Sequence, residues 1–177
     1  MIRDLTAVDG LLHVRLFNED DTLASELWVP NMVTDIGDKY YAEAGAALCA
    51  NGTVAAPAGI TGMRLGTGVT AASKTGAGAA IGTYISGSNV AITGGYPTSS
   101  QPGGAGTARR IIWRGTWNPG VATANSISEV VVTNETPLSN VAGVAANTIA
   151  RAVLSPVQNK GATQTMVVDW YHDILGS

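Results

Sequence analysis

A phosphate-binding loop is the first chemistry that the residues suggest. The run Gly68-Val69-Thr70-Ala71-Ala72-Ser73-Lys74-Thr75 has the first Gly and the final Lys-Thr of a P-loop, but Ser73 stands where the second Gly belongs. A P-loop also needs a following helix whose N–H groups converge on phosphate, and Gly76-Ala77-Gly78 follows instead. We therefore expect an ordinary polar loop. The run Leu65-Gly66-Thr67-Gly68 lacks the third Gly of a dinucleotide fingerprint and predicts a tight turn after a strand.

Nucleophilic and acid–base chemistry would need Ser, Cys, His and carboxylates to converge. His172 and Asp173 are adjacent, and Ser155 or Cys49 would complete a triad on paper. Neighbouring residues of a strand point to opposite faces, so His172 and Asp173 are poorly placed to act as base and orienting group. A solvated chain end is the preferred interpretation of this pair. His13 lies in a strand pattern and is expected to be a half-buried polar residue.

Metal binding is also weakly signalled. One cysteine and two histidines cannot build a zinc site of four cysteines, or of two cysteines and two histidines. The acidic run Glu19-Asp20-Asp21 could bind a hard cation, but it lacks the spacing and the Gly of an EF-hand, so a solvated turn is expected. The sequence implies no cofactor, and we assign no catalytic or metal-binding residue.

One strand pattern concentrates the residues that favour protein contacts. Arg109, Arg110 and Arg114 form the basic cluster of the chain, and Trp113 and Trp117 lie among them. The two tryptophans are expected either in the core or at an interface between subunits, where Trp and Arg are enriched. The arginines would then contact a partner's carboxylates, or lie on a solvated face. These five residues are the interface candidates.

The charge pattern excludes several classes of function. Ten basic and 13 acidic residues are scattered over 177 positions and give a net charge of −3, so no continuous positive surface exists to bind nucleic acid. Charged residues make up only 13% of the chain, against about 25% in ordinary domains. No stretch approaches 18 apolar residues and the first residues lack a signal peptide. We expect synthesis in a reducing cytoplasm and no membrane contact.

These residues must be positioned by a mainly β fold. Alternating apolar residues over 12–29 predict a hairpin, with its turn at Asn18-Glu19-Asp20-Asp21. Thr34 can cap a helix near residues 35–50, the one helix that the pattern supports. Further strands are predicted in short apolar islands and β-branched runs: residues 60–65, 81–85, 90–92, 108–117, 127–133, 148–154 and 164–171. About eight antiparallel strands predict a β-sandwich or a jelly roll.

Residues 51–106 have a different texture, rich in Gly, Ala, Ser and Thr. The short apolar islands within them predict loops and short strands rather than a disordered linker. We expect a single β-rich domain over residues 1–177, with an extended N-terminal arm at 1–10 and a long Gly-rich loop at 94–106. Both segments are candidates for arms that reach neighbouring chains.

A set of short glycine and strand motifs runs along the chain: Asn31 to Gly37 before the Ala-rich helix, Met63 to Ala71, Trp113 to Trp117, Ile127 to Val130, Ile149 to Ala152, and Lys160 to Trp170. In these motifs, which span roughly residues 27 to 171, the chain resembles virion proteins of tailed bacteriophages. The resemblance implies a small β-sandwich or jelly roll without catalytic residues. Such proteins on heads act as decoration, or cement, proteins that bind the outer capsid surface, often as trimers.

Composition supports a structural role independently of that resemblance, because few charges and many small residues let surfaces approach without a large desolvation cost. The main hypothesis is a non-enzymatic homotrimer that binds the major capsid protein and stabilises the head. A tail, fibre or baseplate module is the first alternative. The second is a carbohydrate-binding or hydrolytic jelly roll, which would need exposed aromatic platforms or a facing carboxylate pair; Glu129 and Asp169 are the candidates, and nothing in the sequence shows that they meet.

Overall fold

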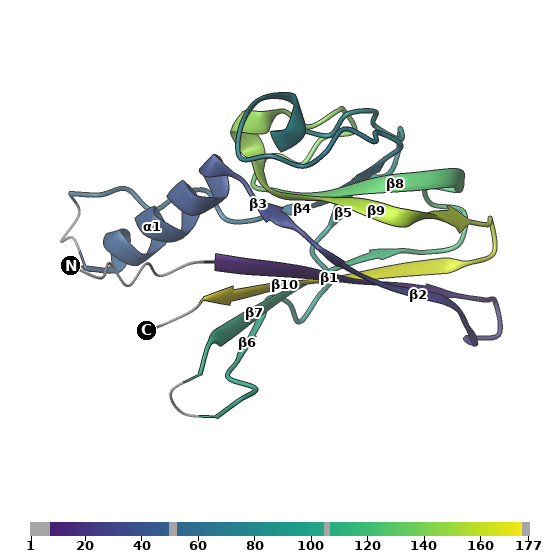
Figure 1. Ribbon diagram of the computed structural model, residues 1–177, viewed down its shortest axis with the longest axis horizontal. Coiled ribbons are helices and arrows are strands. Elements are labelled where there is room, and N and C mark those ends of the chain that lie inside the picture. The colour runs from purple at the N-terminus through teal and green to yellow at the C-terminus, as the bar shows by residue number, and fades with distance from the viewer. Residues whose placement is uncertain (1–7, 50–52, 105–106, 175–177) are drawn as a thin grey trace.

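A computed structural model describes residues 8–49, 53–104 and 107–174, and shows two antiparallel five-stranded sheets packed face to face (Figure 1). Sheet A has the order β2 (Leu23–Pro30), β1 (Val8–Phe17), β10 (Thr165–Ile174), β7 (Arg109–Trp117) and β6 (Thr98–Ser100). Sheet B has the order β3 (Met32–Val33), β9 (Thr148–Lys160), β8 (Ala124–Thr133), β4 (Gly62–Gly66) and β5 (Val90–Ala91). The predicted sandwich is confirmed, but a jelly-roll topology is not established.

The first hairpin forms where the alternation predicted it. Leu12, Val14 and Leu16 point into the core, whereas His13 and Arg15 lie on the opposite side of β1. The turn closes with the Asn18 amide donating to the Thr22 carbonyl at 2.8 Å. The acidic residues of this turn are exposed, as expected of a solvated turn.

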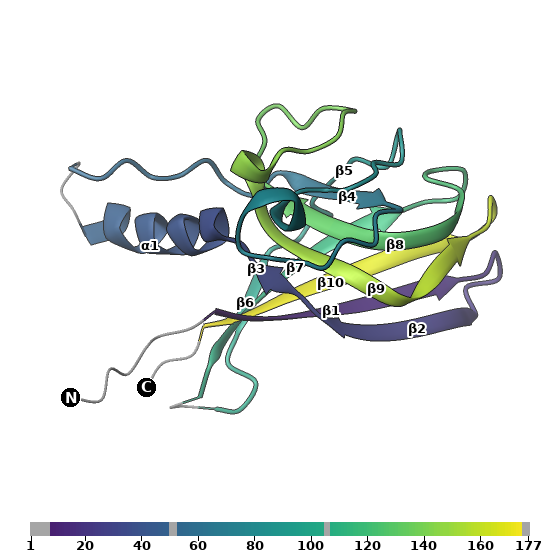
Figure 2. The same cartoon turned by 45° about the horizontal axis from the view of Figure 1, so that its top comes forward.

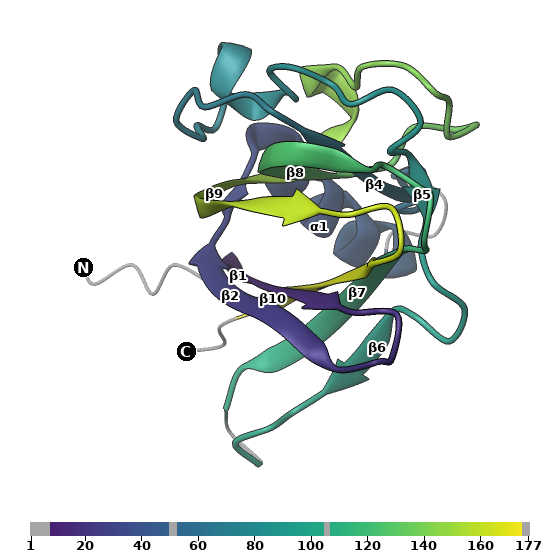
Figure 3. The ribbon, with the colours of Figure 1, turned by 90° about the vertical axis from the view of Figure 1, so that its right-hand side faces the viewer.

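The two sheets are joined at both edges by segments that pass from one sheet to the other (Figure 3). At one edge β2 continues through Asn31 into β3, which pairs with β9. At the other edge the chain leaves β5, and Ile92 forms a bridge with Gly115 of β7. Because corner residues cross the gap between the layers, these connections hold the sheets in a defined relative position.

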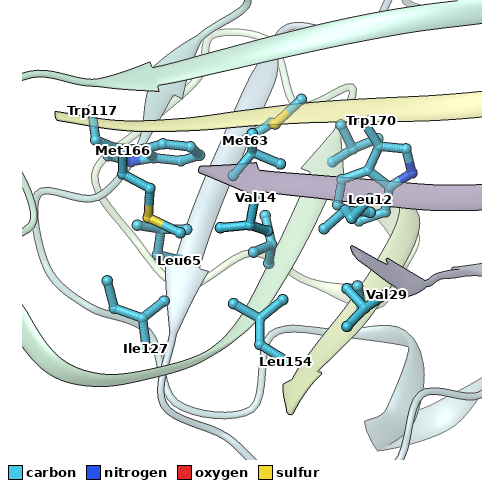
Figure 4. Packing of buried hydrophobic residues seen from close by; sticks show 14 of the residues in the cluster. Leu12, Val14, Val29, Met63, Leu65, Trp117, Ile127, Leu154, Met166 and Trp170 are labelled. Atoms are coloured by element: carbon cyan, nitrogen blue, oxygen red, sulfur yellow. The ribbon is translucent and has the colours of Figure 1, made fainter. Parts of the chain in front are cut away.

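The space between the sheets is filled by aliphatic, methionine and tryptophan side chains (Figure 4). Trp117 and Trp170 are fully buried, and the Trp117 indole donates to the Ser88 carbonyl at 2.7 Å. Each large aromatic removes on the order of 200 Å² from water, which makes the two tryptophans major contributors to the core.

One helix, α1 (Asp35–Cys49), extends from the end of the sandwich beside the ends of β1 and β10 (Figures 1 and 2). The Thr34 hydroxyl accepts a hydrogen bond from the Gly37 amide at 3.0 Å, which is the predicted cap. Gly37 lies against the Ile149 carbonyl, where a Cβ would be only 2.1 Å away. The first turn therefore needs glycine to reach β9.

The segment between α1 and β7 is mostly loop, as its composition predicted. It holds β4, β5, β6 and the 3₁₀ turn η1 (Gly76–Ala79), and a second 3₁₀ turn, η2 (Ala145–Asn147), precedes β9. The strand predicted at 81–85 is wrong, because only Tyr84 pairs there, in a single bridge to Gly66. Of the predicted arms, residues 1–7 and 105–106 lie outside the described residues, 8–10 begin β1, and 98–100 form β6.

Candidate functional site

An apolar groove lies between α1 and the β6–β7 edge of sheet A. It has a volume of about 430 Å³, and its lining is dominated by apolar and aromatic side chains: Tyr40, Tyr41, Ala44, Gly45, Pro97, Thr98, Ser99, Arg109, Ile111, Trp113 and Ile174. We call it the α1 groove. It forms because α1 projects past the end of sheet B, so the inner side of β7 is not covered by the second sheet there.

Buried hydrogen bonds support one wall of the α1 groove. The Trp170 indole donates to Nε2 of His172 at 2.9 Å, and Nδ1 of the same ring is bonded to the Tyr41 hydroxyl. Because an indole only donates, Nε2 of the neutral ring must accept, and Nδ1 carries the proton. Burial lowers the pKa of His172 to about 3 and raises the pKa of Tyr41. The imidazole therefore stays neutral at pH 7 and links β10 to α1.

The solvated environment expected for His172 is wrong. Its side chain is fully buried, since Tyr41 of α1 covers the end of β10. Asp173 points to the other face of the sheet, as the alternation predicted, and it bonds Arg110. The pair thus gives no base and orienting group.

The structure separates the five interface candidates into three environments. Arg109 and Trp113 line the α1 groove, and Trp113 retains 7% of its surface exposed. Trp117 is fully buried in the core, which restricts the interface prediction to the other four. Arg110 and Arg114 lie on the outer face of sheet A.

We call that outer side of β2, β1, β10 and β7 the open face, because no described helix and no second sheet packs on it (Figure 3). Near β7 it is contacted by Tyr96, which stacks on Arg114 at 4.5 Å, and by Thr93, whose hydroxyl lies 3.0 Å from the Thr116 hydroxyl. Asp169 lies at its centre and accepts hydrogen bonds from Arg15 at 2.5 Å and from Arg114 at 2.5 and 2.7 Å. The bonds to Asp169 raise the pKa of Arg114.

Aromatic rings lie beside these ion pairs on the open face. The Trp28 indole stacks on the His13 imidazole, with ring centroids 3.8 Å apart and planes 7° from parallel. Tyr171 lies 5.7 Å from Trp28, and the Arg110 guanidinium lies 5.0 Å over the Tyr171 ring. Sequence analysis missed Trp28 and Tyr171 as candidates. For Tyr171 the available signal was strand parity, because Tyr171 shares its face with Asp169 and Asp173.

The loop 67–83, which contains the P-loop-like run, folds around a carboxylate of the protein itself. The amides of Gly68, Gly82 and Thr83 donate to the Glu129 carboxylate at 2.8 to 3.0 Å. Arg151 donates to the same carboxylate at 2.8 and 3.0 Å, and both side chains are fully buried. The predicted polar loop is confirmed, and Lys74 is exposed and paired with Asp38. Glycine is required at position 68 because a Cβ would lie 2.5 Å from the carboxylate.

The two carboxylates considered for hydrolysis lie on opposite sides of the sandwich. Glu129 is on the outer side of sheet B beneath the loop 67–83, and Asp169 is on the open face of sheet A. They cannot flank one glycosidic bond. No cluster of three or more metal-ligating side chains occurs within the described residues.

Comparison of the chain with family models, with curated proteins and with solved structures finds no match. In the described part of the chain, no helix has the length and apolar character needed to cross a membrane.

Proposed function

We propose that the protein is a non-enzymatic component of a tailed-phage virion that decorates the outer surface of the head and bridges subunits of the major capsid protein. The α1 groove is the observation that carries the proposal. It presents aromatic and aliphatic side chains with Arg109 at one side, at the end of the molecule that projects beyond the sandwich. Partly buried aromatic and arginine side chains are the usual anchors of protein interfaces.

The other charged groups support binding rather than turnover. Glu129 is held by Arg151 and three backbone amides, and Asp169 is held by two arginines. Carboxylates held by several donors have fixed positions, which suits a rigid surface rather than a group that must exchange protons with a substrate.

Assembly would strengthen individually weak contacts. A symmetric homotrimer carries three copies of each groove, and once one copy binds, the others are held at high effective concentration near their sites. A rigid trimer attached at several points would resist the outward pressure of packaged DNA. The trimeric state follows from the resemblance to phage decoration proteins.

The test is cosedimentation of the purified protein with empty heads of the virus that encodes it, and with tails in parallel. Gly45 lines the groove on an exposed turn of α1, and a Cβ there meets no atom within 4 Å. Gly45→Arg should fill the groove and reduce binding to heads by about tenfold or more, since a clash at an anchor excludes the partner. Gly45→Ala is the matched control and should bind like the natural protein.

Binding to heads that Gly45→Arg removes and Gly45→Ala retains would support the proposal. Binding to tails alone would instead favour the tail, fibre or baseplate module. Equal binding of both variants to heads would exclude the α1 groove as the contact.

A further inference from the structure

A rigid aromatic platform lies on the open face, away from the α1 groove. Trp28 is 49% exposed, whereas His13 beneath it keeps 8% of its surface, so one face of the indole is covered and the other faces solvent. His13 donates to Glu26 at 2.6 Å, which fixes the imidazole on which the indole rests. The other three tryptophans are buried. Trp28 is therefore presented to solvent as a flat, supported ring.

A hollow with both apolar and charged side chains in its walls lies on the same face, beside Tyr171. It has a volume of about 250 Å³. Its lining comes from β1, β2, β7 and β10: Asp9, Gly10, Leu11, Pro30, Arg110, Tyr171 and Asp173. Arg110 is held by Asp173 through two bonds of 2.8 and 2.7 Å, so the guanidinium and the carboxylate have fixed positions. The hollow is smaller than the pockets of drug-sized ligands, about 300 to 1,000 Å³, and it suits one small ring.

The charges of the open face are nearly balanced. Arg15, Arg110 and Arg114 lie among four carboxylates, those of Asp9, Glu26, Asp169 and Asp173, and most of these groups are already paired with one another. Among these described residues the three arginines are all paired, so a polyanion would find no free cation, and a cation would find three of the four carboxylates, Glu26, Asp169 and Asp173, already bonded to His or Arg. A neutral ligand is the one that this face accommodates at the smallest electrostatic cost.

We propose that the open face binds a neutral sugar, with one ring stacked on Trp28 and Tyr171 and its hydroxyls bonded in the hollow by Asp9, Arg110 and Asp173. A neutral pyranose combines an apolar C–H face, which packs on an aromatic ring, with a rim of hydroxyls. Paired hydroxyls match the two oxygens of a carboxylate and the fork of a guanidinium. Small-ligand sites typically combine apolar walls with a few fixed polar groups in this way. This site is separate from the groove proposed to contact the capsid.

The test uses the isolated protein, without heads. A glycan array carrying neutral and sialylated glycans identifies the best neutral ligand, and titration calorimetry then measures its affinity. Tryptophan emission should change on addition of that glycan, because Trp28 is the exposed indole. Trp28→Ala should weaken binding by about tenfold, which corresponds to the loss of one aromatic contact. Asp173→Asn should weaken it as well, by removing a fixed acceptor.

Val157→Ala is the matched control, since Val157 is also exposed but lies on β9, outside the open face; its affinity should not change. The proposal is overturned if no neutral glycan binds, if only sialylated glycans bind, or if binding survives Trp28→Ala. Failure of the Gly45→Arg experiment leaves this test unaffected.

Discussion

The ion pairs on the outer faces of the two sheets differ in how far they are buried. On sheet B, loops cover the surface and enclose Glu129 and Arg151, which are both fully buried. On sheet A the surface is open, and Arg110 and Asp173 keep 30% and 24% of their side chains exposed. Removing one partner of a buried pair is strongly destabilising, because the other charge is left buried and unpaired. A pair that is partly exposed is screened by water and contributes much less to stability. The Glu129–Arg151 pair of sheet B thus holds loops in place, whereas the Arg110–Asp173 pair of sheet A stays accessible to a ligand.

Substituting one member of an ion pair on each face tests this contrast, and the Glu129 variant should give the largest change in the free energy of unfolding. Glu129→Gln keeps the side-chain shape but leaves the Arg151 cation buried without its counter-charge. We expect the free energy of unfolding to fall by about 3 to 5 kcal/mol. Asp173→Asn on the open face should change it by less than about 1 kcal/mol. Urea unfolding of the two variants measures both values, and equal losses would contradict the contrast.

Acid should destabilise the folded protein through His172, which lies on the inner side of sheet A. His172 has a pKa of about 3 in the folded protein, against 6.5 in the unfolded chain. Below pH 6.5 the unfolded chain binds a proton that the folded protein does not, so this group makes stability fall as pH drops from about 6.5 to about 3. Each unit within that window corresponds to about 1.4 kcal/mol.

The measurement is urea unfolding from pH 7 to pH 4 of the natural protein and of His172→Gln. Glutamine can still accept from Trp170 and donate to Tyr41, but it does not titrate. The contribution of carboxylates cancels in the difference between the two proteins. A steeper acid loss in the natural protein is expected, and parallel curves would show that the imidazole is not the group responsible.

Two glycine substitutions test how tightly the loop over sheet B is packed, with a smaller expected change in stability. At Gly68 a Cβ would lie 2.5 Å from Glu129 Oε1, so Gly68→Ala must displace the loop or the carboxylate. We expect a loss of about 1 to 3 kcal/mol, as for other overpacked sites. Gly45→Ala meets open space on α1 and should be neutral or stabilising by up to about 1 kcal/mol. Thermal unfolding compares them, and a neutral Gly68→Ala would mean that the loop is not held on Glu129.

Much of the fold could be predicted from local patterns. The period of two placed the hairpin over 12–29 and the late strands, and the Thr34 cap placed the start of α1. The strand predicted at 81–85 did not form, because the amides of Gly82 and Thr83 bind Glu129 instead of a neighbouring strand. A partner 46 residues away along the chain leaves no local signal.

The candidate sites were predicted less completely. Arg109 and Trp113 were named, and they line the α1 groove, but Tyr40 and Tyr41 from the helix were not. Trp28 was not singled out because its partner, His13, lies on another strand. Stacking of the two rings depends on the register that places His13 opposite Trp28.

The amino-acid sequence by itself determined which residues of each strand point in and which point out, because successive side chains of a strand alternate. Strand parity alone therefore separates Trp113 and Trp117 from Arg110 and Arg114. Only the tertiary structure decided what covers each side: α1 over His172, loops over Glu129, and no described segment over the outer face of Trp28. Which segment covers a side chain depends on contacts between parts of the chain that are far apart in sequence. Those contacts decide how buried each side chain is, how the pKa of His172 shifts, and which surfaces remain for a partner.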